Sequence, residues 1–427
     1  FARRSAAAGH SIPPAEWRRE WTPSSSACSR RARETTRRGR KPVTERLIVG
    51  NLDCETAFAA QSSDSRQPAA LPRPVLENIS AAATLLRVFC REGDRLWTPV
   101  GVDADRLSGP PELARPALID GPLPTAENTG EVLAWGETGS VTALRARSPA
   151  APAYRQEAPL ADRAWDLPAA CAAAAAGVND KRFCQRLREK LDLALPASRV
   201  LENMRELEDH LEKEKNNPEL SRGWVLKAPF SAAGRLRVIA EGPGAGELEL
   251  KRARNLFEAH GALVFEPWLD RSADFGFCAL VLEERNVLLG SHGLETDAQG
   301  RFRGLAFSPA PIDNLPGVET TVGAAADAAR KEGYLGPLEV DCWSWRDSCG
   351  EEHFHPLGEI NARISFGLVG RAIIETLGEV TGWSSREPSR LLIGPQQLCD
   401  DTAESIELLR PAEPDGCGAW LERSSCA

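Results

Sequence analysis

Residues 338–367 read LEVDCWSWRDSCGEEHFHPLGEINARISFG, and they contain two segments whose polar residues recur at every second position. Glu339 and Asp341 belong to the first segment, and Glu359, Asn361 and Arg363 belong to the second. Because successive side chains of a strand point to opposite faces, each polar set should project from one face of its own strand. The residues between them are mostly apolar, which is typical of half-buried strands. The stretch therefore predicts two strands, each with one polar face.

The sequence DSCG at residues 347–350 favours a turn that folds the second segment back on the first. If the two strands pair, Asp341, Glu359 and Asn361 converge as oxygen ligands beside the cation of Arg363. Oxygen donors suit Mg²⁺, which commonly shares its shell with phosphate oxygens, and a neighbouring arginine can neutralise phosphate. The alternative is an edge hairpin whose charges only face water. Other parts of the chain have to decide between the two interpretations.

The composition of the whole chain limits the possible partners. At 427 residues the chain is long enough for two or three packed units. Its formal net charge of −9 gives no overall basic field, so nucleic acid is not expected as a partner. The longest run of small apolar residues, 168–177, is too short and too rich in alanine to cross a bilayer. We therefore expect neither nucleic acid nor a membrane as a partner.

The 11 cysteines are scattered, without any C-x-C or C-x-x-C pair. Such scattering supports neither a disulfide framework nor a zinc site, and it favours a reducing compartment. The sequence therefore predicts a cytoplasmic protein. The oligomeric state is left open.

Composition and periodicity divide the chain into four regions. Residues 1–44 are rich in arginine and serine and read as a basic extension, either disordered or a targeting segment. Residues 45–155 predict a small parallel α/β domain, with strands near 46–50, 96–100 and 132–135 and a helix over 75–90. Residues 156–382 form the main domain. Residues 383–427 are polar and contain prolines, and we expect a peripheral C-terminal extension.

Three further motifs precede residues 338–367 in the main domain. Asn179 and Asp180 can cap a helix that begins with Lys181. An apolar strand ends at Lys227 and leads into a loop of small residues, 231–234. A third strand ends in the sequence FEPWL, residues 265–269. A lysine against the positive end of a helix dipole, and another in an apolar strand, both suggest an anionic partner. For Lys227 the alternative is a structural acid of the protein itself.

The order of these motifs resembles the ATP-grasp superfamily, and the resemblance covers about residues 178–377. It implies an α/β and α+β fold, in which two α+β lobes clamp ATP and a small parallel α/β domain precedes them. The hinge between the lobes is expected near residues 266–269. No G-x-G-x-x-G follows the first predicted strand, so a dinucleotide site is not supported.

The resemblance implies a role for individual residues toward ATP. Lys181 and Lys227 match the two lysines that contact ATP phosphates. Residues 231–234 match the flap over the phosphates, although this loop contains one glycine where many members have several. The residues expected to bind ATP are Lys181, Lys227, Ser231, Gly234, Glu266, Pro267, Trp268 and Leu269.

The resemblance also implies that Asp341, Glu359 and Asn361 hold one or two Mg²⁺ ions. Arg363 completes an E-x-N-x-R motif like that of biotin carboxylase, where the arginine stabilises developing negative charge. Position 339 is acidic here, whereas ligases of the D-alanine type carry an arginine at that offset. Arg301 and Arg303 are the candidates for the missing contact, and whether Glu339 joins the metal site is left open.

Together these assignments predict an ADP-forming, ATP-dependent carboxylate–amine ligase with small-molecule substrates. Two alternatives remain: a non-catalytic nucleotide-binding module, or a kinase-like enzyme that stops at a phosphorylated product. His353 and His355 could suggest zinc with Glu359, but without a convincing further donor a structural role is the better interpretation.

Overall fold

The structure is a computed structural model that describes residues 46–423 except 62–70, 126–129, 147–153, 169, 232–234, 298–301, 309–316, 348, 384–386 and 396–403. The extension expected over residues 1–44 lies outside the described residues. Within the described ranges, no helix has both the length and the apolar character needed to cross a membrane.

The N-terminal domain is built on a four-stranded parallel sheet with the order β3-β2-β1-β4. Its strands are β1 (Leu47–Val49), β2 (Arg95–Trp97), β3 (Ala117–Ile119) and β4 (Val132–Ala134), and its helices are α1 (Cys54–Gln61), α2 (Arg73–Ala83) and α3 (Gly139–Arg145). Every residue of β1 is fully buried, as expected for a parallel strand that is covered on both faces. The predicted parallel α/β unit is confirmed. The helix predicted over 75–90 changes after α2 into a 3₁₀ helix, Thr84–Phe89.

The small lobe contains a four-stranded antiparallel sheet with the order β5-β8-β6-β7. Its strands are β5 (Arg199–Leu201), β6 (Trp224–Lys227), β7 (Arg237–Ala240) and β8 (Leu263–Pro267), and its helices are α7 (Met204–Glu214) and α8 (Glu247–His260). Trp224 and Phe265 stack at 5.4 Å in its core. The Asn203 side chain caps α7 by accepting from Glu206 N.

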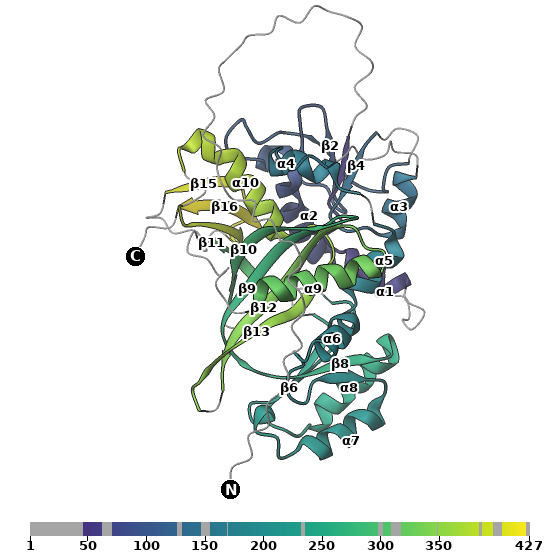
Figure 1. The fold of residues 1–427 in the computed structure, drawn as a ribbon. Helices are drawn as coiled ribbons and strands as arrows, with labels where there is room; N and C mark the ends of the chain where they lie inside the picture. Colours follow the sequence, from purple (N-terminus) through teal and green to yellow (C-terminus); the bar gives the residue numbers. More distant parts are fainter. Residues whose placement is uncertain are drawn as a thin grey trace, which may run out of the picture.

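The large lobe is an eight-stranded sheet with the order β13-β12-β9-β10-β11-β14-β16-β15. Its strands are β9 (Asp270–Val281), β10 (Asn286–Thr296), β11 (Phe302–Phe307), β12 (Gly336–Arg346), β13 (Glu352–Asn361), β14 (Ser389–Gly394), β15 (Ser405–Leu409) and β16 (Gly418–Arg423). Helices α9 (Val318–Lys331) and α10 (Phe366–Thr381) pack on this sheet. Figure 1 shows the large sheet between the N-terminal domain and the small lobe.

Along the chain, three short helices connect the N-terminal domain to the small lobe: α4 (Leu160–Arg163), α5 (Ala172–Asn179) and α6 (Lys181–Lys190). The Asp180 side chain caps α6 by accepting from Arg182 N. Helix α6 contacts β13 of the large sheet and also β5 and β8 of the small sheet. These contacts place the start of α6, which is Lys181, at the junction of the two lobes (Figure 1).

The expectation of a peripheral C-terminal extension needs correction. Strand β14 pairs with β11, and β16 and β15 continue the large sheet. Leu408 and Leu409 are fully buried, and Leu409 also forms a bridge with Leu107 of the N-terminal domain. The average composition of residues 383–427 is polar because polar residues separate three short strands, β14, β15 and β16. The average therefore did not reveal the strands. The C-terminal residues join two domains.

Candidate active site

The two polar strands of residues 338–367 pair with each other in antiparallel orientation. Asp341 lies opposite Glu359, and Glu339 lies opposite Asn361. Because opposite residues of such a pair share a face, the four side chains project from one side of the sheet. Asn361 Nδ2 donates a hydrogen bond to Asp341 Oδ2 at 3.2 Å. The structure thus brings together the three residues predicted as metal ligands, Asp341, Glu359 and Asn361.

Negative charge is in excess at this strand pair. Burial raises the pKa of Asp341 well above its usual range, and the neighbouring carboxylates of Glu339 and Glu359 raise it further. Burial also acts to raise the pKa of Glu359, but Lys181 and Lys227 outweigh it and hold that pKa below its usual value. A divalent cation would favour the ionised form of both acids. The oxygen donors and their charge therefore fit Mg²⁺.

Lys181 reaches this cluster from the first turn of α6. Its Nζ lies 2.5 Å from Glu359 Oε1 and donates to the Ser231 carbonyl oxygen at 2.8 Å. The side chain is largely buried, although it is a cation at the positive end of a helix dipole. The structure thus places Lys181 next to the Glu359 carboxylate and Ser231, and its predicted contact with ATP phosphate stays a prediction.

Lys227 has an acid partner inside the small lobe. Its Nζ lies 2.5 Å from Glu266 Oε2, and Arg188 Nη2 donates to Glu266 Oε1 at 2.6 Å. Burial acts to raise the pKa of Glu266, but the two cations outweigh it and hold that pKa far below its usual value. Lys227 also lowers the pKa of Glu359, so its charge extends to the strand pair. The Glu266 carboxylate, one of the residues expected to bind ATP, is held between Lys227 and Arg188.

Arg188 belongs to none of the motifs that were recognised in the sequence. It follows Lys181 by seven residues, which is two helical turns, so both side chains lie on one face of α6. That spacing was visible in the sequence. The partner was not, because Glu266 is 78 residues away.

The loop after β6 is described only in part. Ser231 lies beside Lys181 and contributes its carbonyl oxygen there. Gly234 lies outside the described residues, so the predicted role of the flap glycine has no structural counterpart here.

The predicted hinge coincides with the passage from the small sheet to the large one. Strand β8 ends at Pro267 and β9 begins at Asp270, so Trp268 and Leu269 are the link between them. Trp268 N donates to Gly223 O at 2.9 Å, and the guanidinium of Arg237 lies 5.5 Å from the Trp268 ring centroid. Both link residues are half-buried.

Arg363 connects the strand pair to the N-terminal domain. Its Nη2 donates to Asn361 Oδ1 at 3.0 Å, and its Nε donates to Glu55 Oε1 of α1 at 3.0 Å. The guanidinium also lies 5.2 Å from the Trp135 ring centroid. Glu55 was missed in the sequence because no spacing relates residues that are 308 positions apart.

Of the other two predicted arginines, the structure describes Arg303, and it does not lie at this cluster. Arg303 lies on β11, which β9 and β10 separate from β12, and its Nη2 donates to Asp297 Oδ2 at 3.1 Å. Arg301 lies outside the described residues. Arg303, a candidate for the substrate-side contact missing at position 339, is thus separated from β12 by β9 and β10.

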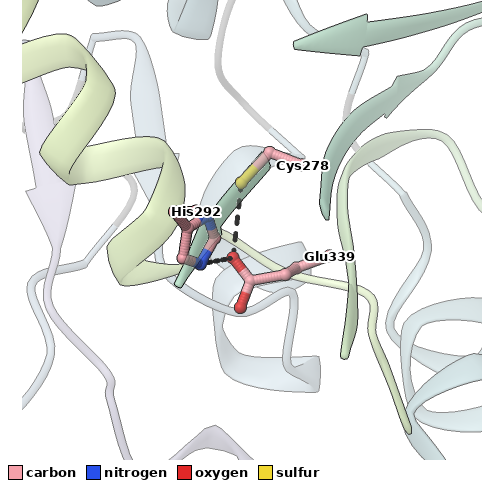
Figure 2. Close-up of side chains that lie close together, drawn as sticks. All are labelled: Cys278, His292 and Glu339. Atoms are coloured by element: carbon pink, nitrogen blue, oxygen red, sulfur yellow. Dashed lines mark hydrogen bonds and ion pairs between the residues drawn. The ribbon is translucent and has the colours of Figure 1, made fainter. Parts of the chain in front are cut away.

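Glu339 belongs to a second, buried cluster on the same face of the sheet. Its Oε2 accepts from Cys278 Sγ at 3.3 Å and from Ser365 Oγ at 2.5 Å, and it lies 3.5 Å from His292 Nε2 (Figure 2). Burial lowers the pKa of His292 to about 4, so the imidazole is neutral. The Glu339 carboxylate thus points at Cys278 and His292, which the sequence analysis did not select.

The histidines of β13 have structural contacts. His353 Nε2 lies 2.9 Å from Asp347 Oδ2, and the His355 ring packs against Trp343 with 4.9 Å between centroids. Burial lowers the pKa of His355 to about 3, which keeps this ring neutral against the indole. These contacts support the structural interpretation of both residues.

The arrangement of a parallel α/β domain followed by two α+β lobes is the ATP-grasp fold, as the motifs predicted. No protein-family model matches the sequence, and no curated protein matches it.

Solved structures do resemble the chain. N5-carboxyaminoimidazole synthetase from Staphylococcus aureus, complexed with ADP, has a TM-score of 0.50 and 11% sequence identity, and the match covers 90% of this chain and 94% of that chain. A second structure of that enzyme has a TM-score of 0.51 and 12% identity, with the same coverage of 90% and 94%. At such low identity the likeness establishes the fold and its extent along nearly the whole chain.

Proposed function

We propose that the chain is an ADP-forming ligase that activates a carboxylate with ATP and joins it to an amine. One observation carries the proposal: Asp341 and Glu359 face the same side of paired strands, and Lys181 meets them from the junction of the two lobes. Two acids, an amide and a lysine in this arrangement suit a metal-bound polyphosphate. The S. aureus synthetase of the same fold is described with ADP, which supports a nucleotide as the ligand.

Asp341, Glu359 and Asn361 would hold Mg²⁺, whose positive charge would offset the negative charge that develops during phosphoryl transfer. Lys181 holds a positive charge next to Glu359 and can turn to a phosphate oxygen when the metal balances that carboxylate. Ser231 fixes the lysine by its carbonyl oxygen. These residues position and neutralise charge, which is the main requirement of phosphoryl transfer.

The nucleoside is proposed to lie at the link between the lobes. Pro267, Trp268 and Leu269 line the passage from β8 to β9. Glu266 acts here by holding Lys227 and Arg188 rather than by contacting the nucleoside with its carboxylate. Lys227, which also influences Glu359, is then positioned between the link and the strand pair.

In the proposed reaction a carboxylate oxygen attacks the γ-phosphorus of ATP and ADP leaves. The amine nitrogen then attacks the acyl carbon, phosphate leaves, and the nitrogen releases a proton. Arg363 is positioned by Asn361 and Glu55 at the edge of the metal ligands, where its charge can stabilise the acyl-phosphate oxygens.

The test is ADP release from ATP and Mg²⁺ with pooled carboxylates, measured with and without pooled amines. We expect ADP release that depends on both pools, together with a new condensed mass. A stable phosphorylated product that forms without an amine would favour the kinase-like alternative. ATP binding without ADP release would favour a non-catalytic module.

A further inference from the structure

The buried cluster next to the proposed Mg²⁺ ligands combines a thiol, an imidazole and a carboxylate from three neighbouring strands. Cys278 lies on β9, His292 on β10 and Glu339 on β12. One possible ligand atom from each lies within 4.8 Å of the others, and Figure 2 shows Cys278 and His292 both directed at one carboxylate oxygen of Glu339. We propose that this cluster is a structural zinc site, separate from the oxygen-only set of Asp341, Glu359 and Asn361.

The first argument is the unsatisfied imidazole. The His292 side chain is 0% exposed, and neither ring nitrogen has a hydrogen-bond partner within the described part of the chain. A neutral imidazole normally donates from one nitrogen and accepts at the other, and burial without partners is costly. His292 Nε2 is directed at the Glu339 carboxylate at 3.5 Å, which is longer than a hydrogen bond. A metal ion between the two groups would satisfy this nitrogen.

The second argument is the spacing. Bond lengths of about 2.0–2.3 Å to sulfur, nitrogen and oxygen place the ligands of a tetrahedral zinc about 3.3–3.6 Å from one another. Cys278 Sγ lies 3.3 Å from Glu339 Oε2, and His292 Nε2 lies 3.5 Å from the same oxygen. Two of the three ligand-atom separations are thus close to those of a tetrahedral site, and all three atoms lie within 4.8 Å of one another.

The third argument is the close approach of two glycines to the cluster. A Cβ on Gly367 of α10 would lie 2.5 Å from Glu339 Oε2 and 2.8 Å from Cys278 Sγ. A Cβ on Gly276 of β9 would lie 2.4 Å from His292 Nε2. Any other residue at either position would therefore clash with atoms of the cluster. The first turn of α10 thus covers the cluster without occupying it.

Ligand chemistry selects the ion. Thiolate and imidazole favour zinc, whereas Mg²⁺ prefers oxygen alone. As the Zn–S bond forms, the Cys278 thiol releases its proton to solvent. Zn²⁺ with one thiolate, one carboxylate and a neutral imidazole has no net charge, so the closed site can stay buried. Ser365 Oγ, 3.8 Å from Cys278 Sγ and bonded to Glu339, is at hand as a fourth donor.

A zinc ion here would join β9, β10 and β12 beneath α10 and fix Glu339 two residues from Asp341. The carboxylate of Glu339 would then be committed to zinc, and the adjacent oxygen cluster would keep its own metal. The inference does not depend on the proposed ligase reaction.

The experiment uses the full chain, stripped with a chelator and titrated with Zn²⁺ against a chromophoric competitor. The variants are Cys278→Ser and His292→Asn, and the matched control is Cys342→Ser, another buried cysteine of this sheet whose thiol contacts Phe275 O. We expect one zinc per chain in the wild type and in the control. Loss of a ligand should weaken binding by at least the ~10–100-fold known for outer-shell partners.

Co²⁺ substitution supplies a readout that does not depend on how the variants fold. The wild-type chain should show a thiolate-to-cobalt charge-transfer band that excess Mg²⁺ does not remove. A wild-type chain without that band, or a Cys278→Ser chain that binds zinc as tightly as the control, would overturn the proposal. The second result would place the ion at the oxygen ligands instead.

Discussion

Two acidic regions of this molecule are balanced in opposite ways. In the small lobe, the single carboxylate of Glu266 contacts two cations, Arg188 and Lys227, and its pKa is strongly lowered. At the β12–β13 pair, Asp341 lies near two other acids, and burial with their charge raises its pKa. Both regions are buried, so exposure does not explain the difference. The difference lies in direct contacts with cations: Glu266 contacts two, whereas the hydrogen bond that Asp341 accepts comes from the Asn361 amide.

The comparison separates a scaffold from a binding site. A carboxylate already saturated by two buried cations has no further charge to offer a ligand, and it fixes the side chains around it. A region with excess negative charge is completed only by a cation from outside. On this basis we assign Glu266 to holding the small lobe and its lysine, and the strand pair to holding Mg²⁺.

The largest expected effect is the loss of stability in Glu266→Gln. Removing this charge leaves Arg188 and Lys227 buried with no carboxylate between them, and breaking a buried ion pair costs about 3–5 kcal/mol. Urea unfolding should show this decrease in the free energy of unfolding. Glu258→Gln, an exposed change on α8, is the control and should leave stability unchanged.

Asp341→Asn should change the free energy of unfolding in the opposite direction to Glu266→Gln. Without metal, the neutral amide relieves the repulsion from Glu339 and Glu359, so the free energy of unfolding measured in chelator is expected to rise. The Mg²⁺ concentration needed for half-maximal ADP formation should increase by about 10–100-fold or more, since a ligand is lost. A decrease in stability as large as that of Glu266→Gln would remove the distinction between the two regions.

The pH dependence of stability should also follow the comparison. Because the pKa of Glu266 is lower in the folded than in the unfolded chain, the unfolded state takes up the proton first as pH falls. Its stabilising contribution is therefore complete above the usual value of 4.5 and decreases as pH falls below it. The difference in unfolding free energy between wild type and Glu266→Gln should shrink over that range. A constant difference would contradict the assignment.

The smallest expected effect concerns the link to the N-terminal domain. Glu55→Gln keeps a hydrogen bond to Arg363 but removes its charge, so Arg363 should be positioned less firmly. We expect the rate of ADP formation to decrease several-fold, with little change in ATP affinity. A reduced affinity with an unchanged rate would assign Glu55 and Arg363 to nucleotide binding instead.

The sequence predicted the strand pair well because the required information is local. The period of two in Glu339/Asp341 and Glu359/Asn361 defined the faces, and the turn at residues 347–350 brought the strands together. Capping of α6 and α7 by Asp180 and Asn203 is local in the same way.

The residues that were missed depend on distant pairing. Strand β12 lies beside β9, and β9 beside β10, so Cys278 and His292 meet Glu339 only through the order of the sheet. Glu55 reaches Arg363 across two domains. The spacing of residues along one strand or helix could not have predicted these contacts.

The most direct test of the central claim compares Mg²⁺-dependent ADP formation in Glu359→Gln and Glu352→Gln. Both changes neutralise an acid on β13, but Glu352 is exposed and contacts Ser272, whereas Glu359 faces Asp341. We predict that Glu359→Gln loses about 100-fold or more of the rate while ATP affinity changes by no more than a few fold, and that Glu352→Gln behaves as wild type. Equal rates in the two variants would contradict the assignment of the strand pair as the metal site.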